Sequence, residues 1–388
     1  MKEEKERYYF DHNATTQVRP EVIRAMLPCL GMYYGNPSSV HSFGREARNY
    51  LEVSREKVAK LINAEPDEIF FTGCGTESDN IALIGCLNAA EGKRNGLITS
   101  QVEHSAILKA ATALENKGHP VTRVGVDGSG RVDFTELKNS VDENTLLVSI
   151  MHANNETGVV QDIVQAAEIA HESGAYFHTD AVQATGKTAI DVKAMNIDML
   201  SMSGHKINAP KGIGALYIKK GVTVNPLTYG GSQERGIRPG TENISGIVAF
   251  ARALEIAVDE MDARKTKLTA LVERLETGIE SAIENVFFNG RDAERISGTS
   301  NVSIPGVDGE ALLFSLDMAG IAASTGSACS TGEVEPSHVL VAMGCNPKVA
   351  QSSLRFSMGY DTTEEGVDRI LEILPAIVER LRSVSAGL

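Results

Sequence analysis

The sequence predicts an α/β fold: a large domain with a mostly parallel, seven-stranded sheet flanked by helices, and a smaller α+β C-terminal domain. Seven short apolar segments alternate with helical patterns through the first two thirds of the chain. Such alternation of strands and helices favours a parallel sheet covered by helices. After about residue 245 the pattern changes to long helices with few strands. With 388 residues, the chain is long enough for two or three domains.

The seven strands predicted for the large sheet are rich in β-branched or aromatic residues and are bounded by Gly, Asn, Asp or Pro. They are residues 68–72, 96–100, 120–126, 145–151, 175–180, 198–203 and 213–218. Apolar residues at three- and four-residue spacing predict helices between several of these strands. These helices cover residues 45–62, 77–90, 105–117 and 163–173.

The C-terminal third is predicted to be mostly helical, starting with one long helical run over residues 247–285. Its other predicted elements are a strand at 299–304, a helix at 308–319, a short strand at 321–323, a helix near 348, a strand at 353–358 and a closing helix at 363–382. We therefore expect a large domain of residues 16–255. A small domain would combine residues 1–15 with residues 256–388.

Composition and charge exclude several classes of protein. The chain has 37 basic and 51 acidic residues, for a formal net charge of −14, whereas proteins that bind nucleic acid or anionic membranes favour positive charge. Its five Cys form no CxxC pair and no His/Cys spacing of a metal site, which favours a reducing compartment. No targeting pattern and no run of about 18 apolar residues occurs. We expect a cytoplasmic protein that binds neither nucleic acid nor membranes.

Four polar side chains each follow a predicted strand: His104, Asn155, Asp180 and Lys206. In α/β proteins the carboxyl ends of parallel strands meet at the edge of the sheet where ligands bind, so we expect these side chains to converge. Taken alone, a loop lysine is usually a solvated surface residue. An Asp at a strand end can equally cap a turn or hold a protonated ring nitrogen. The grouping of the four residues, rather than any single one, indicates a site.

The segment TGCGTES at residues 72–78 follows a predicted strand and opens a helix. Glycines ahead of a helix N-terminus expose backbone N–H groups that favour an anion such as phosphate. Thr76 is equally suited to cap the helix. No GK[ST] sequence follows, so the segment is not a P-loop. An anion site and a simple cap both remain open interpretations.

Ten motifs run in order along nearly the whole chain. They are FDHNATT (10–16), GNPSSVHSFG (35–44), FTGCGTESDN (71–80), VEH (102–104), HANNETG (152–158), FHTDAVQA (177–184), SMSGHK (201–206), GGSQERGIRPGTEN (230–243), STGSACS (324–330) and SSLRFSMG (352–359). In these motifs the chain resembles the cysteine desulfurases of the class V aminotransferase family, which have pyridoxal phosphate (PLP) fold type I. The loop STGSACS resembles the group I, NifS/IscS-like branch. CGTESDN together with HANNETG is most similar to the NifS members.

The resemblance implies PLP as the cofactor and assigns residues to it. Lys206 would attach the cofactor covalently, and Asp180 would pair with its ring nitrogen. His104 would stack on the ring and move protons. The remaining ligands would be Asn155 and Gln183 on the ring hydroxyl, and Gly75, Thr76, Ser203, His205 and the neighbouring subunit's Thr241 on the phosphate. A phosphate contact made by the neighbouring subunit implies a homodimer.

The resemblance also implies a reaction in which L-cysteine becomes L-alanine and its sulfur passes to an acceptor. Arg355 would bind the substrate carboxylate, because its guanidinium fork is bidentate, with help from Asn155 and Asn36. Cys329, on a loop of Ser, Thr and Gly in the small domain, would take the sulfur as a persulfide. The acceptor would be a protein such as an iron–sulfur scaffold. The sequence does not identify it.

Two other functions fit parts of the sequence. A selenocysteine lyase or another class V PLP transferase is the alternative enzyme, although an aminotransferase needs no Cys-bearing loop. A sulfur-carrier or scaffold protein that has lost activity is the alternative that is not an enzyme. The presence of Lys206, Asp180, His104 and Arg355 argues against this last interpretation.

Overall fold

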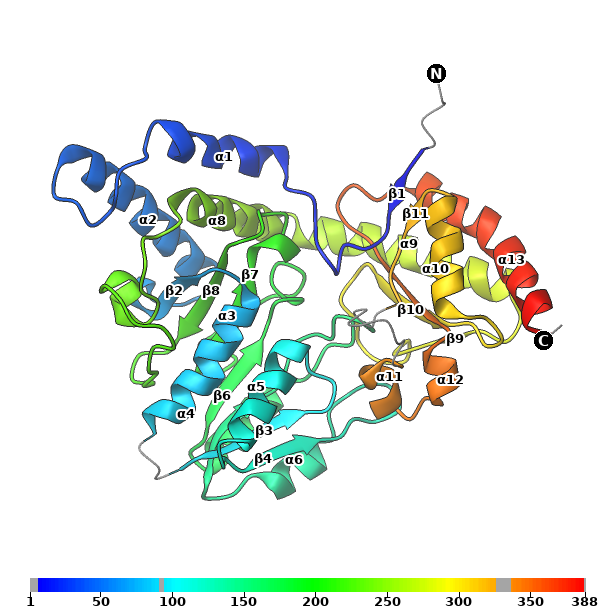
Figure 1. Cartoon of the computed structure of the whole chain (residues 1–388), viewed down its shortest axis with the longest axis horizontal. Coiled ribbons are helices and arrows are strands. Elements are labelled where there is room, and N and C mark those ends of the chain that lie inside the picture. Colours follow the sequence, from blue (N-terminus) through cyan, green and yellow to red (C-terminus); the bar gives the residue numbers. More distant parts are fainter. Residues whose placement is uncertain (1–5, 91–93, 326–335, 387–388) are drawn as a thin grey trace.

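The structure, a computed structural model, describes residues 6–90, 94–325 and 336–386. Figure 1 shows a large sheet with its helices on one side of the molecule and a smaller sheet with long helices on the other. The chain starts on the smaller side and then crosses to the larger one. Within the described residues, no helix is long and apolar enough to cross a membrane.

The large sheet has seven strands in the order β2-β8-β7-β6-β5-β3-β4. Strand β8 is antiparallel to both of its neighbours, and the other pairs are parallel. The strands are β2 (Ile69–Thr72), β3 (Gly96–Ser100), β4 (Val121–Val124), β5 (Thr145–Ser149), β6 (Tyr176–Asp180), β7 (Met199–Ser203) and β8 (Gly214–Ile218). Each strand lies within one of the seven predicted segments, and the predicted α/β fold is confirmed.

Helices cover both faces of this sheet, because successive side chains of a strand point to opposite faces. Ile98 and Val148 belong to the core on one face, whereas their neighbours Leu97 and Leu147 belong to the core on the other. The first face carries α1 (Pro20–Gly31), α2 (Ser42–Leu61), α6 (Phe134–Ser140), α7 (Ile163–Glu172) and α8 (Ile244–Asp259). The second carries α3 (Gly75–Asn80), a π-helical turn (Ile81–Gly85), α4 (Cys86–Ala89) and α5 (Ser105–Glu115).

The smaller sheet is antiparallel, in the order β12-β10-β9, and packs against long helices around a separate apolar core. Its elements are α9 (Met261–Ala282), β9 (Phe287–Phe288), β10 (Thr299–Ser303), α10 (Gly309–Met318), β12 (Ser353–Ser357) and α13 (Glu364–Ala386). Strand β1 (Tyr8–Tyr9) pairs in parallel with β11 (Ile321–Ala322), so the N-terminal segment joins this part. Two short helices, α11 (His338–Ala342) and α12 (Pro347–Ala350), connect β11 to β12. The division into two domains at residues 255 and 256 stays a prediction.

The prediction of one long helix over residues 247–285 is wrong in one respect, because the structure has two helices that meet at Glu260. The backbone of Glu260 leaves the helical region at φ −93° and ψ 1°, and its carboxylate pairs with Arg19 Nη1 at 2.5 Å. The apolar residues of α8, such as Leu254, pack in the large core, and those of α9, such as Leu275, pack in the small one. Periodicity continues across the break, so the sequence pattern does not reveal it.

Candidate active site

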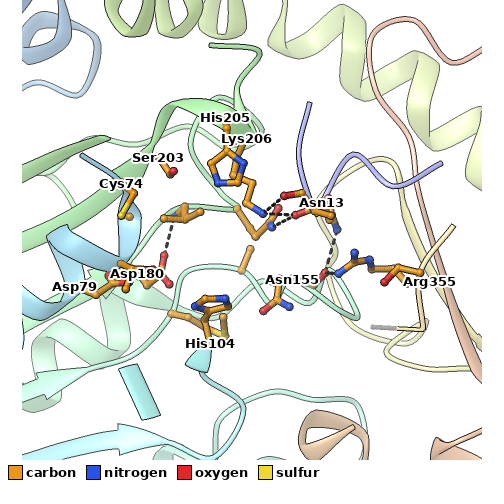
Figure 2. Close-up of a pocket in the computed structure, with 18 residues that line it drawn as sticks. Asn13, Cys74, Asp79, His104, Asn155, Asp180, Ser203, His205, Lys206 and Arg355 are labelled. Atoms are coloured by element: carbon orange, nitrogen blue, oxygen red, sulfur yellow. Dashed lines mark hydrogen bonds between the residues drawn. The ribbon is translucent and has the colours of Figure 1, made fainter. Parts of the chain in front are cut away.

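A cavity of about 410 Å³ opens at the carboxyl edge of the large sheet, where it faces the smaller sheet (Figure 2). Its lining comes from the ends of several large-sheet strands, from the N-terminal segment and from β12. The lining residues are Asn13, Ala14, Cys74, Gly75, Thr76, Asp79, His104, Met151, Ala153, Asn155, Asp180, Val182, Gln183, Ser203, His205, Lys206, Ser324 and Arg355.

Most residues singled out in the sequence meet at this cavity, and three do not. Thr241 lines a separate surface hollow next to Pro239 and Gly240. Asn36 is exposed, and its Oδ1 accepts a hydrogen bond from the backbone N–H of Ser38 at 2.9 Å. Cys329 lies outside the described residues. The roles given to all of the singled-out residues, whether or not they line the cavity, stay predictions.

Lys206 closes a short 3-10 turn, Gly204–Lys206, directly after β7. Its Nζ donates to the carbonyl oxygens of Asn13, at 2.5 Å, and Ala14, at 2.7 Å. Burial, together with the positive charge of Arg355, lowers the pKa of Lys206 to about 8. A lysine with a lowered pKa is neutral more often at neutral pH, so this amine is suited to act as a nucleophile or a base.

Asp180 is the last residue of β6 and is buried at the base of the cavity. Its Oδ1 accepts a hydrogen bond from the Val182 N–H at 2.9 Å. Burial raises its pKa, while the nearby His104 and Lys206 lower it. A second carboxylate, Asp79, is buried beside it, and burial and the charge of Asp180 raise the pKa of Asp79 well above its usual range. Two buried carboxyl groups at one point favour a cationic N–H of a ligand.

His104 precedes α5 and caps its N-terminus. The Ala106 N–H donates to His104 Nδ1 at 3.2 Å, so the proton of the neutral ring is on Nε2. Burial lowers the pKa of His104, and the charge of Asp180 partly opposes this effect. A neutral imidazole on the cavity wall is suited to stack on a flat ring and to move a proton.

An anion fits at the part of the cavity wall formed by Gly75 and Ser203. Gly75 begins α3, and a Cβ at this position would lie 2.7 Å from Val182 Cγ2, so a side chain there would fill the space. Ser203 is buried, and its Oγ has no hydrogen-bond partner among the described residues. Since a buried hydroxyl without a partner is costly, a ligand oxygen at this point is favoured. His205 and Thr76 lie on the same wall.

Arg355 enters the cavity from the other direction, on β12. Its Nη2 pairs with Asp11 Oδ1 at 2.6 Å, and its Nη1 donates to the Asn155 carbonyl oxygen at 2.9 Å. Its Nε has no partner among the described residues. The guanidinium therefore has a free N–H and one exchangeable carboxylate partner, as a site for a substrate carboxylate requires.

Sequence reasoning missed the role of Asn13 at this site. The Asn13 carbonyl accepts from Lys206 and also from Gln183 Nε2, at 2.9 Å, and its Nδ2 donates to the Asn155 carbonyl at 3.2 Å. The residue was part of the motif FDHNATT but had no assigned role. Most of these contacts use backbone atoms, whose position a residue type does not reveal.

Comparison with known proteins identifies the class. The model of the aminotransferase class-V family matches residues 8–370, and the chain belongs to this family. A relative named cysteine desulfurase 2, from Trichormus variabilis, is 50% identical over 97% of this chain and 94% of its own length. A relative from Clostridium botulinum named cysteine desulfurase IscS is 47% identical over 97% of this chain and 96% of its own length.

Solved structures agree with this family. A NifS-like protein has a TM-score of 0.92 and 39% identity, and the match covers 97% of this chain and 100% of that one. A NifS-like protein from Rickettsia africae has a TM-score of 0.86 and 31% identity over 96% of this chain and 100% of that one. The predicted resemblance to NifS/IscS-like cysteine desulfurases is confirmed. The placement nearest to the NifS members stays a prediction.

Enzymes of this class use PLP, and the predicted cofactor is confirmed at the level of the family. The cavity fits such a group. It has the unpartnered Ser203 hydroxyl beside a glycine-lined helix start for a phosphate, buried carboxyl groups for a ring N–H and an amine with a lowered pKa for covalent attachment. These features come from strand ends that the sheet topology brings together.

Proposed function

We propose that this chain is a cysteine desulfurase that removes sulfur from L-cysteine, releases L-alanine and carries the sulfur as a persulfide on Cys329. One observation carries the proposal: Lys206 and Arg355 open onto the same cavity from two different sheets. This arrangement puts a group that binds the cofactor opposite a group that binds the substrate carboxylate. The family and the names of its relatives support the same conclusion.

Residues of the large sheet would hold the cofactor. When bound, PLP supplies an electron sink for negative charge that develops at the substrate Cα. Asp180 would accept a hydrogen bond from the ring nitrogen, and its negative charge would keep that nitrogen protonated. Gly75, Thr76, Ser203 and His205 would surround the phosphate, whose charge the start of α3 favours.

Residues around Arg355 would bind and orient the substrate. The carboxylate of L-cysteine would take the free Nε and replace Asp11 on the guanidinium fork. Asn155 lines the same wall. The Lys206 amine would then take the proton from the substrate Cα, since its lowered pKa favours the basic form. His104 would move protons at the substrate sulfur.

Cys329 would complete the reaction. Its thiolate attacks the substrate sulfur, an S–S bond forms, and the bond between the substrate Cβ and sulfur breaks. The electron pair left on carbon takes up a proton, so that alanine results and the sulfur remains on the enzyme. A protein acceptor, such as an iron–sulfur scaffold in the cytoplasm, would then receive the sulfur.

A homodimer of two-domain subunits would share these sites. Apolar side chains that are at least half exposed occur close together along the chain in and after α1: Leu27, Leu30, Met32, Tyr34, Val40 and Phe43. Burying them against a second copy is favourable. Thr241 lies in a hollow with Tyr229, which is 91% exposed, and would reach the neighbouring phosphate from there. The two apolar cores, joined at Glu260, support the division into domains.

A direct test compares Cys329→Ala with the matched Cys345→Ala. Cys345 is partly buried, and burial raises the pKa of its thiol. After exposure to L-cysteine, peptide mass spectrometry should find one extra sulfur atom on Cys329 in the wild type and in Cys345→Ala, removed by reductant. Cys329→Ala should form neither alanine nor persulfide. Full alanine production by Cys329→Ala, or a persulfide on Cys345, would refute the proposal.

A further inference from the structure

A second lysine, Lys187, lies behind the cavity and contacts two of the residues around it. It follows β6 by seven residues and does not line the cavity. Its Nζ donates to Gln183 Oε1 at 2.9 Å and to Asn13 Oδ1 at 3.2 Å. Gln183 and Asn13 are both buried, with about 3% of each residue exposed. A partly buried lysine that bonds to two amide oxygens, rather than to a carboxylate, has no role in the function proposed above.

We infer that Lys187 is a positioning residue that fixes the side-chain amides of Gln183 and Asn13, so that the Gln183 NH2 group faces the cofactor and the Asn13 NH2 group bonds to the Asn155 carbonyl beside Arg355. This inference rests on the proposed function, because it concerns how this chain receives PLP. A lysine at this place can determine which end of each amide points inward, since an amide has a donor end and an acceptor end.

The Gln183 amide shows why its orientation matters. Its Nε2 donates to the Asn13 carbonyl oxygen, which can only accept, and its Oε1 accepts from Lys187. Nε2 carries two hydrogens, and the second has no partner among the described residues that line the cavity. The ring oxygen of PLP is an acceptor when ionised and therefore needs a donor. A rotated amide would place Oε1, an acceptor, against the Asn13 carbonyl oxygen, which is also an acceptor, and would offer no donor to the ring oxygen when PLP is bound.

Lys187 also orients the Asn13 amide, which lies toward Arg355 and the proposed site of the substrate carboxylate. With Oδ1 on Lys187, Nδ2 donates to Thr299 Oγ1 at 3.0 Å and to the Asn155 carbonyl. That carbonyl also accepts from Arg355 Nη1. The Asn13 carbonyl accepts from Lys206 Nζ. Lys187 thus supports a network that reaches the attachment lysine and the guanidinium, although it touches neither of them.

The charges around Lys187 agree with a supporting role. Burial and the positive charges of Lys206, Arg264 and Arg355 lower its pKa well below the usual range of lysine. His12 also faces it, and burial lowers the pKa of that imidazole. Lys187 makes no ion pair with a carboxylate among the described residues. Its two hydrogen bonds to amide oxygens are made whether the amine is charged or neutral.

Lys187→Met in the PLP-loaded protein tests the inference, because Met keeps the apolar length and removes the donors. The readout is the pH titration of the cofactor absorbance, whose midpoint depends on hydrogen bonds to the ring oxygen. The midpoint should rise by about one pH unit, the size expected for a lost hydrogen bond to a charged group. The matched control is Lys193→Met. Lys193 lies six residues further along the chain, is exposed, and pairs with Glu65 at 2.6 Å. Its loss should leave the midpoint of the absorbance titration unchanged.

A double-mutant cycle with Gln183→Ala asks whether Lys187 acts through the amide. Gln183→Ala should shift the midpoint by a similar amount, and Lys187→Met should add little in that background. If Lys187→Met fails to fold, Lys187→Gln, which keeps a shorter polar group, is titrated instead. A wild-type midpoint in a folded Lys187 variant, or fully additive shifts, would overturn the inference. A wild-type protein without any PLP absorbance band would instead refute the proposed function.

Discussion

The two sheets contribute to the cavity in different ways. On the large sheet, the functional side chains lie at or just after strand ends: Asp180 ends β6, and Lys206 follows β7. On the smaller sheet, Arg355 lies in the middle of β12 and is paired with Asn301 of β10. Its neighbours Leu354 and Phe356 point into the small apolar core, so alternation along the strand turns Arg355 the other way, toward the cavity.

This difference shows how much each side of the cavity depends on the rest of the fold. Neighbouring parallel strands bring their carboxyl ends together without further support, so the proposed cofactor side follows from sheet topology. The proposed substrate side needs two separate sheets to face each other. The N-terminal segment joins them, because Asp11 pairs with Arg355 and the carbonyl of Asn13 accepts from Lys206.

The largest expected effect is on the large-sheet side. Lys206→Ala should abolish covalent attachment of PLP and lower the rate of alanine formation by at least about 10³-fold, since both the attachment point and the base are lost. Borohydride reduction followed by peptide mass spectrometry should place the cofactor on Lys206 in the wild type. The exposed Lys211, five residues later, gives the control, and Lys211→Ala should retain attachment. An adduct on Lys187 or Lys211 would contradict the assignment.

On the small-sheet side, loss of Arg355 should weaken substrate binding and leave the cofactor in place. Arg355→Gln should raise KM for L-cysteine about 100-fold, as expected when a charge-assisted pair is lost. Arg355→Lys keeps the positive charge but loses the bidentate guanidinium, so its KM for L-cysteine should rise by about tenfold, between those of the wild type and Arg355→Gln. The absorbance of bound PLP should be unchanged in both variants. A loss of PLP instead of substrate affinity would show that the two sides are not separate.

The same contrast explains what the sequence could predict. The seven strands were predictable because each is a short apolar run bounded by turn residues, and the convergence of Asp180 and Lys206 follows from parallel topology. The inclusion of Arg355 came from resemblance, since nothing in the strand LRFSM shows which site it faces.

Other features depend on contacts between distant segments. At the break, Glu260 pairs with Arg19, which is 241 residues away in the sequence, while the helical pattern itself continues. The buried Asp79 falls on α3, where an acidic residue resembles any exposed helical carboxylate. Asn13 acts largely through its backbone carbonyl, which periodicity and residue type do not describe.

The pH dependence of cofactor capture tests how the small sheet influences the large one. In the PLP-free protein, the neutral amine of Lys206 is the nucleophile, and its pKa is lowered to about 8. The capture rate should therefore rise with pH and level off above pH 8, and it should fall about tenfold for each unit below that point. Stopped-flow absorbance measures this rate. Arg355→Gln removes one cation that lowers this pKa, so its profile should shift to higher pH, and an unshifted profile would show that Arg355 has no such influence.

The smallest expected effects come from two matched helix caps, one in each part. Asp162 precedes α7 and accepts from the Gln165 N–H at 3.0 Å, and Asp308 precedes α10 and accepts from the Ala311 N–H at 2.8 Å. Each Asp→Ala change should lower the free energy of unfolding by about 1 kcal/mol, because one backbone N–H loses its partner.

Urea unfolding, followed by circular dichroism, then shows whether the two parts of the chain unfold separately or together. If residues 16–255 and the remainder are independent domains, each variant should shift one of two transitions and leave the other in place. If the two parts unfold together, both variants should shift a single transition equally, and the proposed domain division would have no thermodynamic meaning.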